Sequence, residues 1–208
     1  MTLTDAQIDR YSRQIIVPHI GGRGQERLLA ARMLLVGDAR DIEAPLAYLV
    51  GAGVRTIAIR VSDNSDRLAE MISASRELNP DVSATIAMPN GSVDLALAIL
   101  GSEAARKVAD EIANDRDVKA LVIAHLDPPE KIIVIPDTQS PRIIDESSAA
   151  TGSLGGSHYG KGLGVRSSDF IAMLAITEAF KLLAGYAENP ARAIIEFDSY
   201  ATTVRAYP

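Results

Sequence analysis

The side chains that most often perform chemistry are few in this sequence and are not spaced as a site. The three histidines, at 19, 125 and 158, have no metal-binding spacing, so each is expected to be structural or solvated. Asp127 follows a predicted strand, at the edge where open α/β sheets place ligands, although a turn-forming role is the simpler interpretation. The acidic pair at 145–146 has no base or nucleophile spaced to act with it. Residue types alone therefore assign neither a catalytic site nor a metal site.

Composition excludes several classes of function. The chain has no cysteine, which rules out disulfides, Cys-based zinc sites, thioester chemistry and persulfide transfer. Lys and Arg number 21 against 27 Asp and Glu, a net charge of −6, and without a basic run such a chain is not expected to bind nucleic acid. No segment approaches the ~20 apolar residues of a membrane span, and the N-terminus has no apolar leader. We expect a soluble cytoplasmic protein that binds neither nucleic acid nor membrane.

One segment has the composition of an anion-binding loop. Residues 147–168 are rich in Gly and Ser, and the glycine-dense part at 152–164 contains His158 and Lys161. Consecutive backbone N–H groups in such a loop can surround an anion. The same composition cannot bury a core of its own, so a flexible surface loop is the favoured interpretation.

Strands and helices are predicted to alternate along the chain. Helices are expected at 4–15, 25–31, 45–50, 66–78 and 169–183, and strands at 32–37, 55–61, 82–88, 120–124, 131–135, 192–197 and 201–206. The segment 94–114 is predicted to form one long helix or two short ones. Alternation of this kind favours an α/β fold, a Rossmann-like doubly wound and mostly parallel sheet with helices on both faces. We predict a single domain over 1–208, opening with a helical arm at 1–30.

Five blocks of sequence follow one another in a recognisable order. They are 10–18 (RYSRQIIVP), Gly24-Gln25 with 34–37 (LLVG), 48–54 (YLVGAGV), 77–82 (ELNPDV) and 175–185 (AITEAFKLLAG). In this order they resemble the ThiF/MoeB/HesA group of the ubiquitin-activating-enzyme-like superfamily, whose final strand corresponds to Phe197-Asp198. The stretch from about 90 to 160 carries no matching motif.

The resemblance implies a nucleotide site, but its residues are largely missing. The family binds ATP and adenylates the C-terminal glycine of a ubiquitin-like protein, which requires a glycine turn at a helix N-terminus. The family's GxGGxG corresponds to 37–42 (GDARDI), so only Gly37 is retained. Asp38 and Asp41 stand where the triphosphate would lie and would repel it, and Arg40 offsets them only in part.

The ribose site and the catalytic arginine are also altered. The family's Asp-x-Asp corresponds to Val61-Ser62-Asp63, which puts valine in place of the ribose-binding acid. The Asn-Leu-x-Arg-Gln motif that should follow is missing, and Arg67 is the nearest substitute. We therefore expect no autonomous adenylation. ATP with Mg is a cofactor only if a divergent site built from Gly37, Arg40 and Asp63 functions.

Arg13 is the candidate catalytic residue that the resemblance leaves in place. In related dimers the RYxRQ arm resembles a device that inserts its second arginine into the partner's nucleotide site, where a guanidinium can contact phosphate oxygens. An ion pair with a surface acid is an equally weighted alternative for Arg13. Arg10 and Gln14, on the same helix, carry the same ambiguity.

Three functions follow from these observations. The first is a pseudoenzyme, a dimerisation or regulatory partner that forms a homodimer or a heterodimer with a ThiF/MoeB-like paralogue and meets a ubiquitin-like or sulfur-carrier protein. The second is a divergent active adenylyltransferase with a site rebuilt from Arg40, Asp63 and the 152–164 loop. The third is a small-molecule or peptide binding module that uses the C-terminal edge of the sheet.

Overall fold

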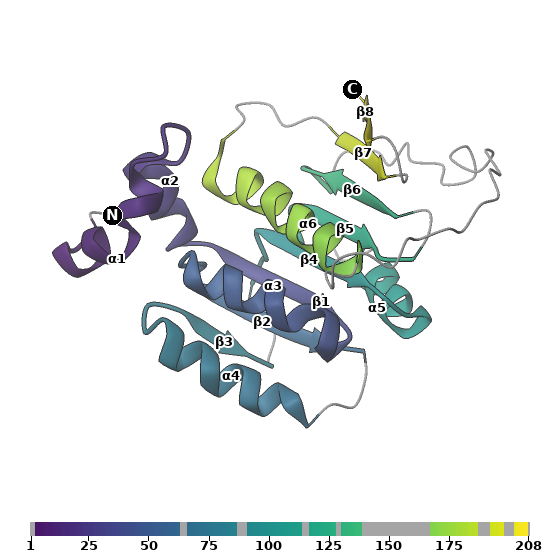
Figure 1. Ribbon diagram of the computed structural model, residues 1–208, viewed down its shortest axis with the longest axis horizontal. Coiled ribbons are helices and arrows are strands. Elements are labelled where there is room, and N and C mark those ends of the chain that lie inside the picture. Colours follow the sequence, from purple (N-terminus) through teal and green to yellow (C-terminus); the bar gives the residue numbers. More distant parts are fainter. Residues whose placement is uncertain are drawn as a thin grey trace.

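A computed structural model describes residues 3–62, 66–86, 91–113, 117–127, 130–138, 167–186, 192–197 and 202–207. Two helices precede the first strand, and six helices and eight strands are found in these ranges (Figure 1). Their order is α1 (Asp5–Ile15), α2 (Gly21–Leu28), β1 (Arg32–Gly37), α3 (Ala39–Gly51), β2 (Thr56–Val61), α4 (Arg67–Leu78), β3 (Ser83–Thr85), β4 (Leu95–Leu100), α5 (Glu103–Ala113), β5 (Leu121–His125), β6 (Lys131–Ile135), α6 (Ser167–Ala184), β7 (Arg192–Phe197) and β8 (Thr202–Tyr207).

The strands form one sheet in the order β3-β2-β1-β4-β5-β6-β7-β8. The first five strands in this order are parallel to one another, and β6, β7 and β8 extend the sheet by antiparallel pairing. After β3 the chain crosses back to form β4 on the other side of β1, so the switch point of the topology lies between β1 and β4. Because β2, β1 and β4 are parallel neighbours, their carboxyl ends lie beside one another. This edge is where doubly wound sheets place ligands.

Successive residues of the central strands supply two hydrophobic cores. Met33 and Leu35 of β1 point to the face covered by α3, α4 and α6, whereas Leu34 and Val36 point to the face covered by α5. Both sets are almost fully buried because β1 lies at the centre of the sheet with a parallel neighbour on each side. The arm α1–α2 packs beside this body, at the end where the parallel strands begin (Figure 1).

The predicted fold class is confirmed, and one element assignment was wrong. The segment 94–114 is not helical throughout, because Leu95–Leu100 forms the central strand β4 and only Glu103–Ala113 forms a helix. All six residues of β4 are buried, since helices cover both faces of the sheet, and this leaves no alternation that would distinguish a strand from a buried helix. The helix expected at 45–50 begins earlier, at Ala39, with Pro45 inside it.

The domain assignment remains a prediction. Of the loop predicted at 147–168, residues 147–166 lie outside the described residues, and Ser167 and Ser168 open α6. Among the helices of the described ranges, none combines the length and the apolar composition that crossing a bilayer requires.

Candidate functional site

Three strand ends meet around one carboxylate at the C-terminal edge of the sheet. Asp38 follows β1, and its Oδ1 accepts hydrogen bonds from the hydroxyls of Ser62, which follows β2, and Ser102, which follows β4. The Ser102 bond measures 3.0 Å. The Ser102 hydroxyl also accepts from the backbone N–H of Ala105 at 3.1 Å and so helps to begin α5. The Asp38 side chain therefore links the carboxyl ends of three parallel strands.

The same carboxylate stands at the N-terminus of α3. Asp38 is the N-cap residue, in an extended conformation, but its side chain does not bond to the backbone of the helix. The free N–H groups and the macrodipole of a helix favour negative charge at this end. Asp38 and Asp41, in the first turn, place negative charge from the chain itself where a bound phosphate would otherwise lie.

Asp41 places a second carboxylate, almost fully buried, at the N-terminus of α3. Its side chain is only 6% exposed, and its Oδ2 lies 2.0 Å from the position that a Cβ at residue 101 would occupy, so only the absence of a side chain at Gly101 admits it. Arg40 pairs with Asp41, with 3.4 Å between Nε and Oδ1, but the Arg40 side chain is 69% exposed. The cation at this corner thus faces solvent, and the carboxylates face the protein.

Gly37 has a steric reason to be glycine. An added Cβ would lie 2.6 Å from Ile42 Cγ2 and 2.7 Å from the backbone oxygen of Ile99. The second contact is with a neighbouring strand and cannot be relieved by turning a side chain. Packing between β1, α3 and β4 therefore accounts for this glycine without a bound phosphate.

The structure brings some of the predicted site residues together and separates others. Gly37, at the end of β1, and Arg40, in the first turn of α3, lie at the same corner, whereas Asp63 lies outside the described residues. Arg13 is exposed in the last turn of α1, at the opposite edge of the sheet. Within the described residues its side chain makes no ion pair or hydrogen bond. Arg13 therefore cannot join Gly37 and Arg40 in the same chain.

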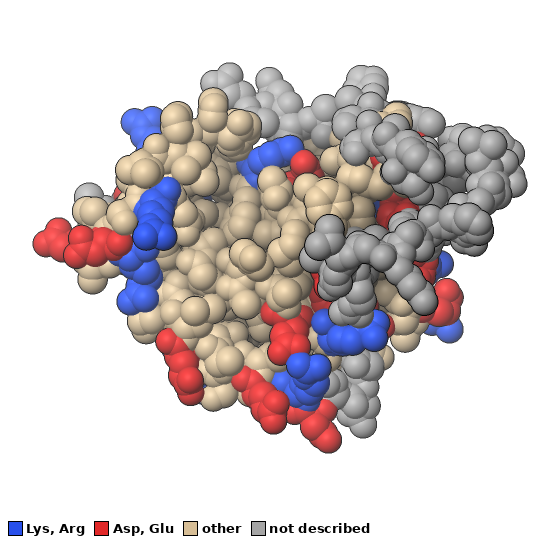
Figure 2. Space-filling model, viewed as in Figure 1, with Lys and Arg blue, Asp and Glu red and all other residues tan. Residues whose placement is uncertain are grey.

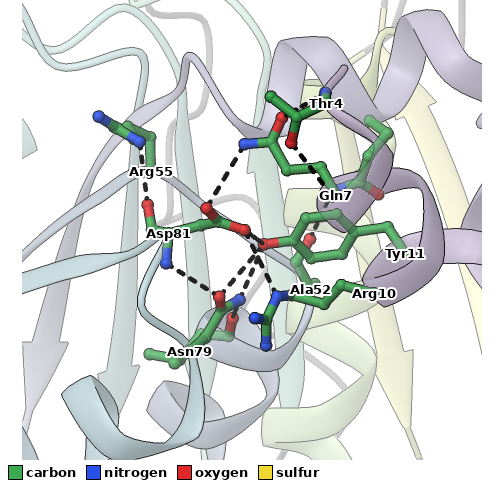
Figure 3. A network of polar contacts seen from close by, with 10 residues as sticks. Thr4, Gln7, Arg10, Tyr11, Ala52, Arg55, Asn79 and Asp81 are labelled. Atoms are coloured by element: carbon green, nitrogen blue, oxygen red, sulfur yellow. Dashed lines mark hydrogen bonds and ion pairs between the residues drawn. The ribbon is translucent and has the colours of Figure 1, made fainter.

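The arm is fixed by a polar network that involves two of the recognised sequence blocks (Figure 3). The Tyr11 hydroxyl is buried, accepts from Asn79 Nδ2 at 2.9 Å and donates to Asp81 Oδ2 at 3.1 Å. Arg10 Nε lies 3.5 Å from the same Asp81 oxygen, and Gln7 donates to the other one. Burial and the hydrogen bond and charge of Asp81 raise the pKa of Tyr11, which keeps the phenol protonated as donor.

The other recognised blocks meet at the same edge. The Tyr11 ring packs on Gly53, where an added Cβ would lie 2.7 Å from it. Buried Gln25 donates to the carbonyl of Ala52 at 3.0 Å. Arg27 donates to the carbonyl of Ala184 at 3.2 Å, beside Gly185. The retained motifs thus build the junction between the arm and the sheet, at the edge opposite Asp38.

Among the described residues at the C-terminal edge of the sheet, His125 has the pKa that departs furthest from its ordinary value. It ends β5, and burial, with smaller effects of Lys131 and Arg106, lowers its pKa to about 4. Its Nε2 is buried and has no hydrogen-bond partner among the described residues. Asp127, which the sequence placed beyond the strand end, forms an exposed ion pair with Arg106 at 2.9 Å. A histidine that is neutral at pH 7 fits a structural role at this position.

Comparison with curated proteins identifies relatives of part of the chain. No model of a known protein family matches it. The chain is 38% identical over 97 residues to the adenylyltransferase and sulfurtransferase uba4 of Pyricularia oryzae, which covers 38% of this chain and 20% of that protein. It is 45% identical over 60 residues to a sulfur carrier protein adenylyltransferase of Thermus thermophilus, covering 28% and 22%. The resemblance to the ThiF/MoeB/HesA group is confirmed.

The match to these ThiF/MoeB-like relatives is limited in length. A probable adenylyltransferase/sulfurtransferase MoeZ of Mycobacterium tuberculosis is 48% identical over 58 residues, which is 27% of this chain and 14% of MoeZ. The matched part spans about a fifth or less of each of the three relatives.

Solved structures share the fold over nearly the whole chain. E. coli MccB aligns with a TM-score of 0.66 at 10% identity, over 99% of this chain and 70% of MccB. PaaA aligns with a TM-score of 0.65 at 15% identity, over 99% of this chain and 75% of PaaA. At these identities the similarity establishes the fold, which agrees with the α/β class predicted from the sequence.

Two members of the Asp38 cluster were not foreseen from the sequence. Ser62 was noted only as the middle residue of the altered ribose motif, and Ser102 was assigned to a helix. Ser62 is the first residue after β2 and Ser102 the second after β4, positions at the carboxyl ends of parallel strands that signal the ligand edge. Recognition of β4 as a strand would have placed Ser102 beside Asp38.

Proposed function

We propose that this chain is a non-catalytic, ThiF/MoeB-like protein that acts as a dimerisation or regulatory partner of an active ubiquitin-like-protein-activating adenylyltransferase. The observation that supports the proposal most strongly is the Asp38 carboxylate. It stands at the N-terminus of α3 and is held by Ser62 and Ser102. A nucleotide phosphate bound at this helix end would lie against the carboxylates of Asp38 and Asp41, whereas the Arg40 guanidinium faces solvent.

The chain has lost the nucleotide site and retained the arm with its contacts to the sheet, and a partner role is consistent with both. An ATP site in this fold would need backbone N–H groups open to an anion. Here the glycine turn is shortened to Gly37 alone, and the helix begins within two residues of it. The arm, by contrast, keeps its complete network to Asn79 and Asp81. A partner role requires a folded surface that carries the arm, and it does not require nucleotide binding.

The relatives suggest the class of partner. Those that match by sequence are named as adenylyltransferases and sulfurtransferases, one of them acting on a sulfur carrier protein. E. coli MccB has been solved with ATP and with MccA. For this chain we propose a cytoplasmic role beside an adenylyltransferase of this kind, with a ubiquitin-like or sulfur-carrier protein as the shared substrate.

Arg13 is the residue through which such a role would act. Its guanidinium is exposed on an arm that is fixed to the body of the protein, a geometry suited to contacting phosphate oxygens in another subunit. The test is pyrophosphate exchange by a co-purified ThiF/MoeB-like paralogue with and without this chain. Stimulation by wild type and its loss with Arg13→Ala are expected, while Arg23→Ala, an exposed arginine of α2, serves as control. Equal stimulation by Arg13→Ala would refute the trans-arginine role.

A further inference from the structure

A hollow with charged walls lies at the edge where the parallel strands begin, opposite Asp38. It has a volume of about 470 Å³, which is within the range of small-molecule sites. Its walls come from the segment between α2 and β1, the residues that lead into β4 and β5, and the last turn of α6. Three charged side chains, Arg27, Asp94 and Lys119, line it together with apolar ones.

This hollow differs in character from the larger groove between the arm, α3 and α6. The larger groove, of about 690 Å³, is lined mostly by apolar side chains. Figure 2 shows the corresponding face as a broad area without charged side chains. A wall with few polar groups selects little among apolar ligands, whereas charges beside apolar walls define both the charge and the orientation of a ligand.

The carboxylate of Asp94 is engaged by its own chain. Its Oδ1 lies 2.7 Å from Lys119 Nζ, and its Oδ2 accepts from the backbone N–H of Arg32 at 2.9 Å. The backbone is fixed as well, because the N–H of Asp94 donates to the carbonyl of Arg32 and the N–H of Lys119 donates to that of Val93. Asp94 therefore balances the charge of Lys119, and both of its oxygens already accept a hydrogen bond.

Arg27 supplies a positive charge that no acid matches among the described residues. Its Nη1 donates to the carbonyl of Ala184 at 3.2 Å, and within the described ranges its guanidinium makes no other hydrogen bond or ion pair. Gly185 permits this approach, since an added Cβ there would overlap Nη1. A guanidinium has five N–H donors, so most of them remain available. Two cations against one carboxylate leave the hollow with one unmatched positive charge.

The remaining walls are apolar and belong to regular elements of the fold. Leu95, which opens β4, is fully buried, and Ala120, which precedes β5, is 6% exposed. Leu182 and Leu183 of α6 are half-buried. A hydrocarbon chain or an aromatic ring in the hollow would remove their exposed surface from water. The walls are in place before a ligand arrives, so little ordering entropy would be lost on binding.

We propose that this hollow binds a small-molecule monocarboxylate, with the carboxylate on Arg27 and an apolar body against Leu182 and Leu183. A guanidinium can donate two parallel hydrogen bonds to a carboxylate, whose single charge balances the site. A phosphate monoester would bring excess negative charge, and an amine would add a cation beside Arg27 and Lys119. The site is independent of the proposed function, because it lies at the edge of the sheet opposite Asp38.

Isothermal titration of the full chain with sodium octanoate tests the proposal, with octanamide as the neutral probe of the same length. One-site binding of octanoate is expected with a dissociation constant below about 1 mM, and octanamide should bind at least about tenfold more weakly. Arg27→Gln should raise the octanoate constant at least about tenfold. Ala30→Phe should do the same, because it fills the hollow from an exposed lining position and leaves every charge in place.

Two controls separate this site from others, and circular dichroism confirms that each variant is folded. Arg23→Gln alters an exposed arginine of α2 outside the lining, and Tyr48→Asp alters the larger apolar groove; both should leave the octanoate constant within about twofold. No saturable binding up to about 10 mM octanoate overturns the proposal. So does a constant unchanged by Ala30→Phe or by folded Arg27→Gln, equal affinity for octanamide, or equal weakening by either control.

Discussion

The junction between the arm and the sheet makes a quantitative prediction about Tyr11. Tyr11→Phe removes a hydroxyl that is buried and bonded to Asn79 Nδ2 at 2.9 Å and to Asp81 Oδ2 at 3.1 Å. Asn79 Nδ2 keeps its bond to the carbonyl of Val50, at 2.7 Å, so the main loss is the donor to a carboxylate. Hydrogen bonds to charged groups contribute about 1.5–3 kcal/mol, and we expect Tyr11→Phe to lower the free energy of unfolding by about 2 kcal/mol.

Urea unfolding monitored by circular dichroism measures this change. Tyr48→Phe is the control, because Tyr48 is 61% exposed and should lose less than about 0.5 kcal/mol. Arg10→Met should also cost little, about 0.5 kcal/mol, since its ion pair with Asp81 spans 3.5 Å and is partly exposed. If Tyr11→Phe unfolds with the same midpoint as Tyr48→Phe, the arm motif is not retained for folding and our interpretation of the network is refuted.

Two further predictions concern the opposite edge of the sheet. Gly37→Ala should lower the free energy of unfolding in urea by about 2–3 kcal/mol, because the added Cβ would press on the backbone oxygen of Ile99. Gly51→Ala is the control, and it should be neutral or stabilising because no atom lies within 4 Å of its Cβ. Equal effects of the two substitutions would contradict the steric role of Gly37. Protonation of His125, whose pKa is about 4 when folded and near 6.5 when unfolded, favours the unfolded chain, so stability should fall as the pH drops from 6.5 towards 4. The full difference corresponds to about 3 kcal/mol, and solvent screening of a partly exposed ring reduces the expected loss to roughly 1–2 kcal/mol. His125→Gln should remove this component of a stability–pH profile, and an unchanged profile would show that another group is responsible.

The sequence predicted the elements whose ends carry a residue signal better than those without one. The capping box of Thr4 and Gln7, followed by helix-forming residues, predicts the start of α1. The glycine after Val36 predicts the end of β1. Leu95–Leu100 carries no such signal, because burial on both faces removes any alternation. The contacts of Asp38 with Ser62 and Ser102 span 24 and 64 residues, and they arise only once the strand order is known.

The recognised motifs illustrate a second limit of sequence reasoning. Arg10 and Tyr11 were grouped with Arg13 as parts of one arm device, yet Arg10 and Tyr11 contact Asp81 of their own chain and Arg13 does not. Spacing along α1 could not separate them, because the docking partner lies about seventy residues further along, as the bond from Tyr11 to Asp81 records. A retained motif is therefore evidence for fold or for function only after its contacts are known.

Isothermal titration of the purified chain with Mg·ATP tests the central claim most directly, namely that the carboxylates of Asp38 and Asp41 have replaced the nucleotide phosphates. We predict no saturable heat up to about 1 mM ATP, which corresponds to an association weaker than roughly −4 kcal/mol. Saturable one-site binding at micromolar ATP, weakened by Arg40→Ala and unaffected by Arg60→Ala on β2, would contradict the claim and restore the adenylyltransferase interpretation.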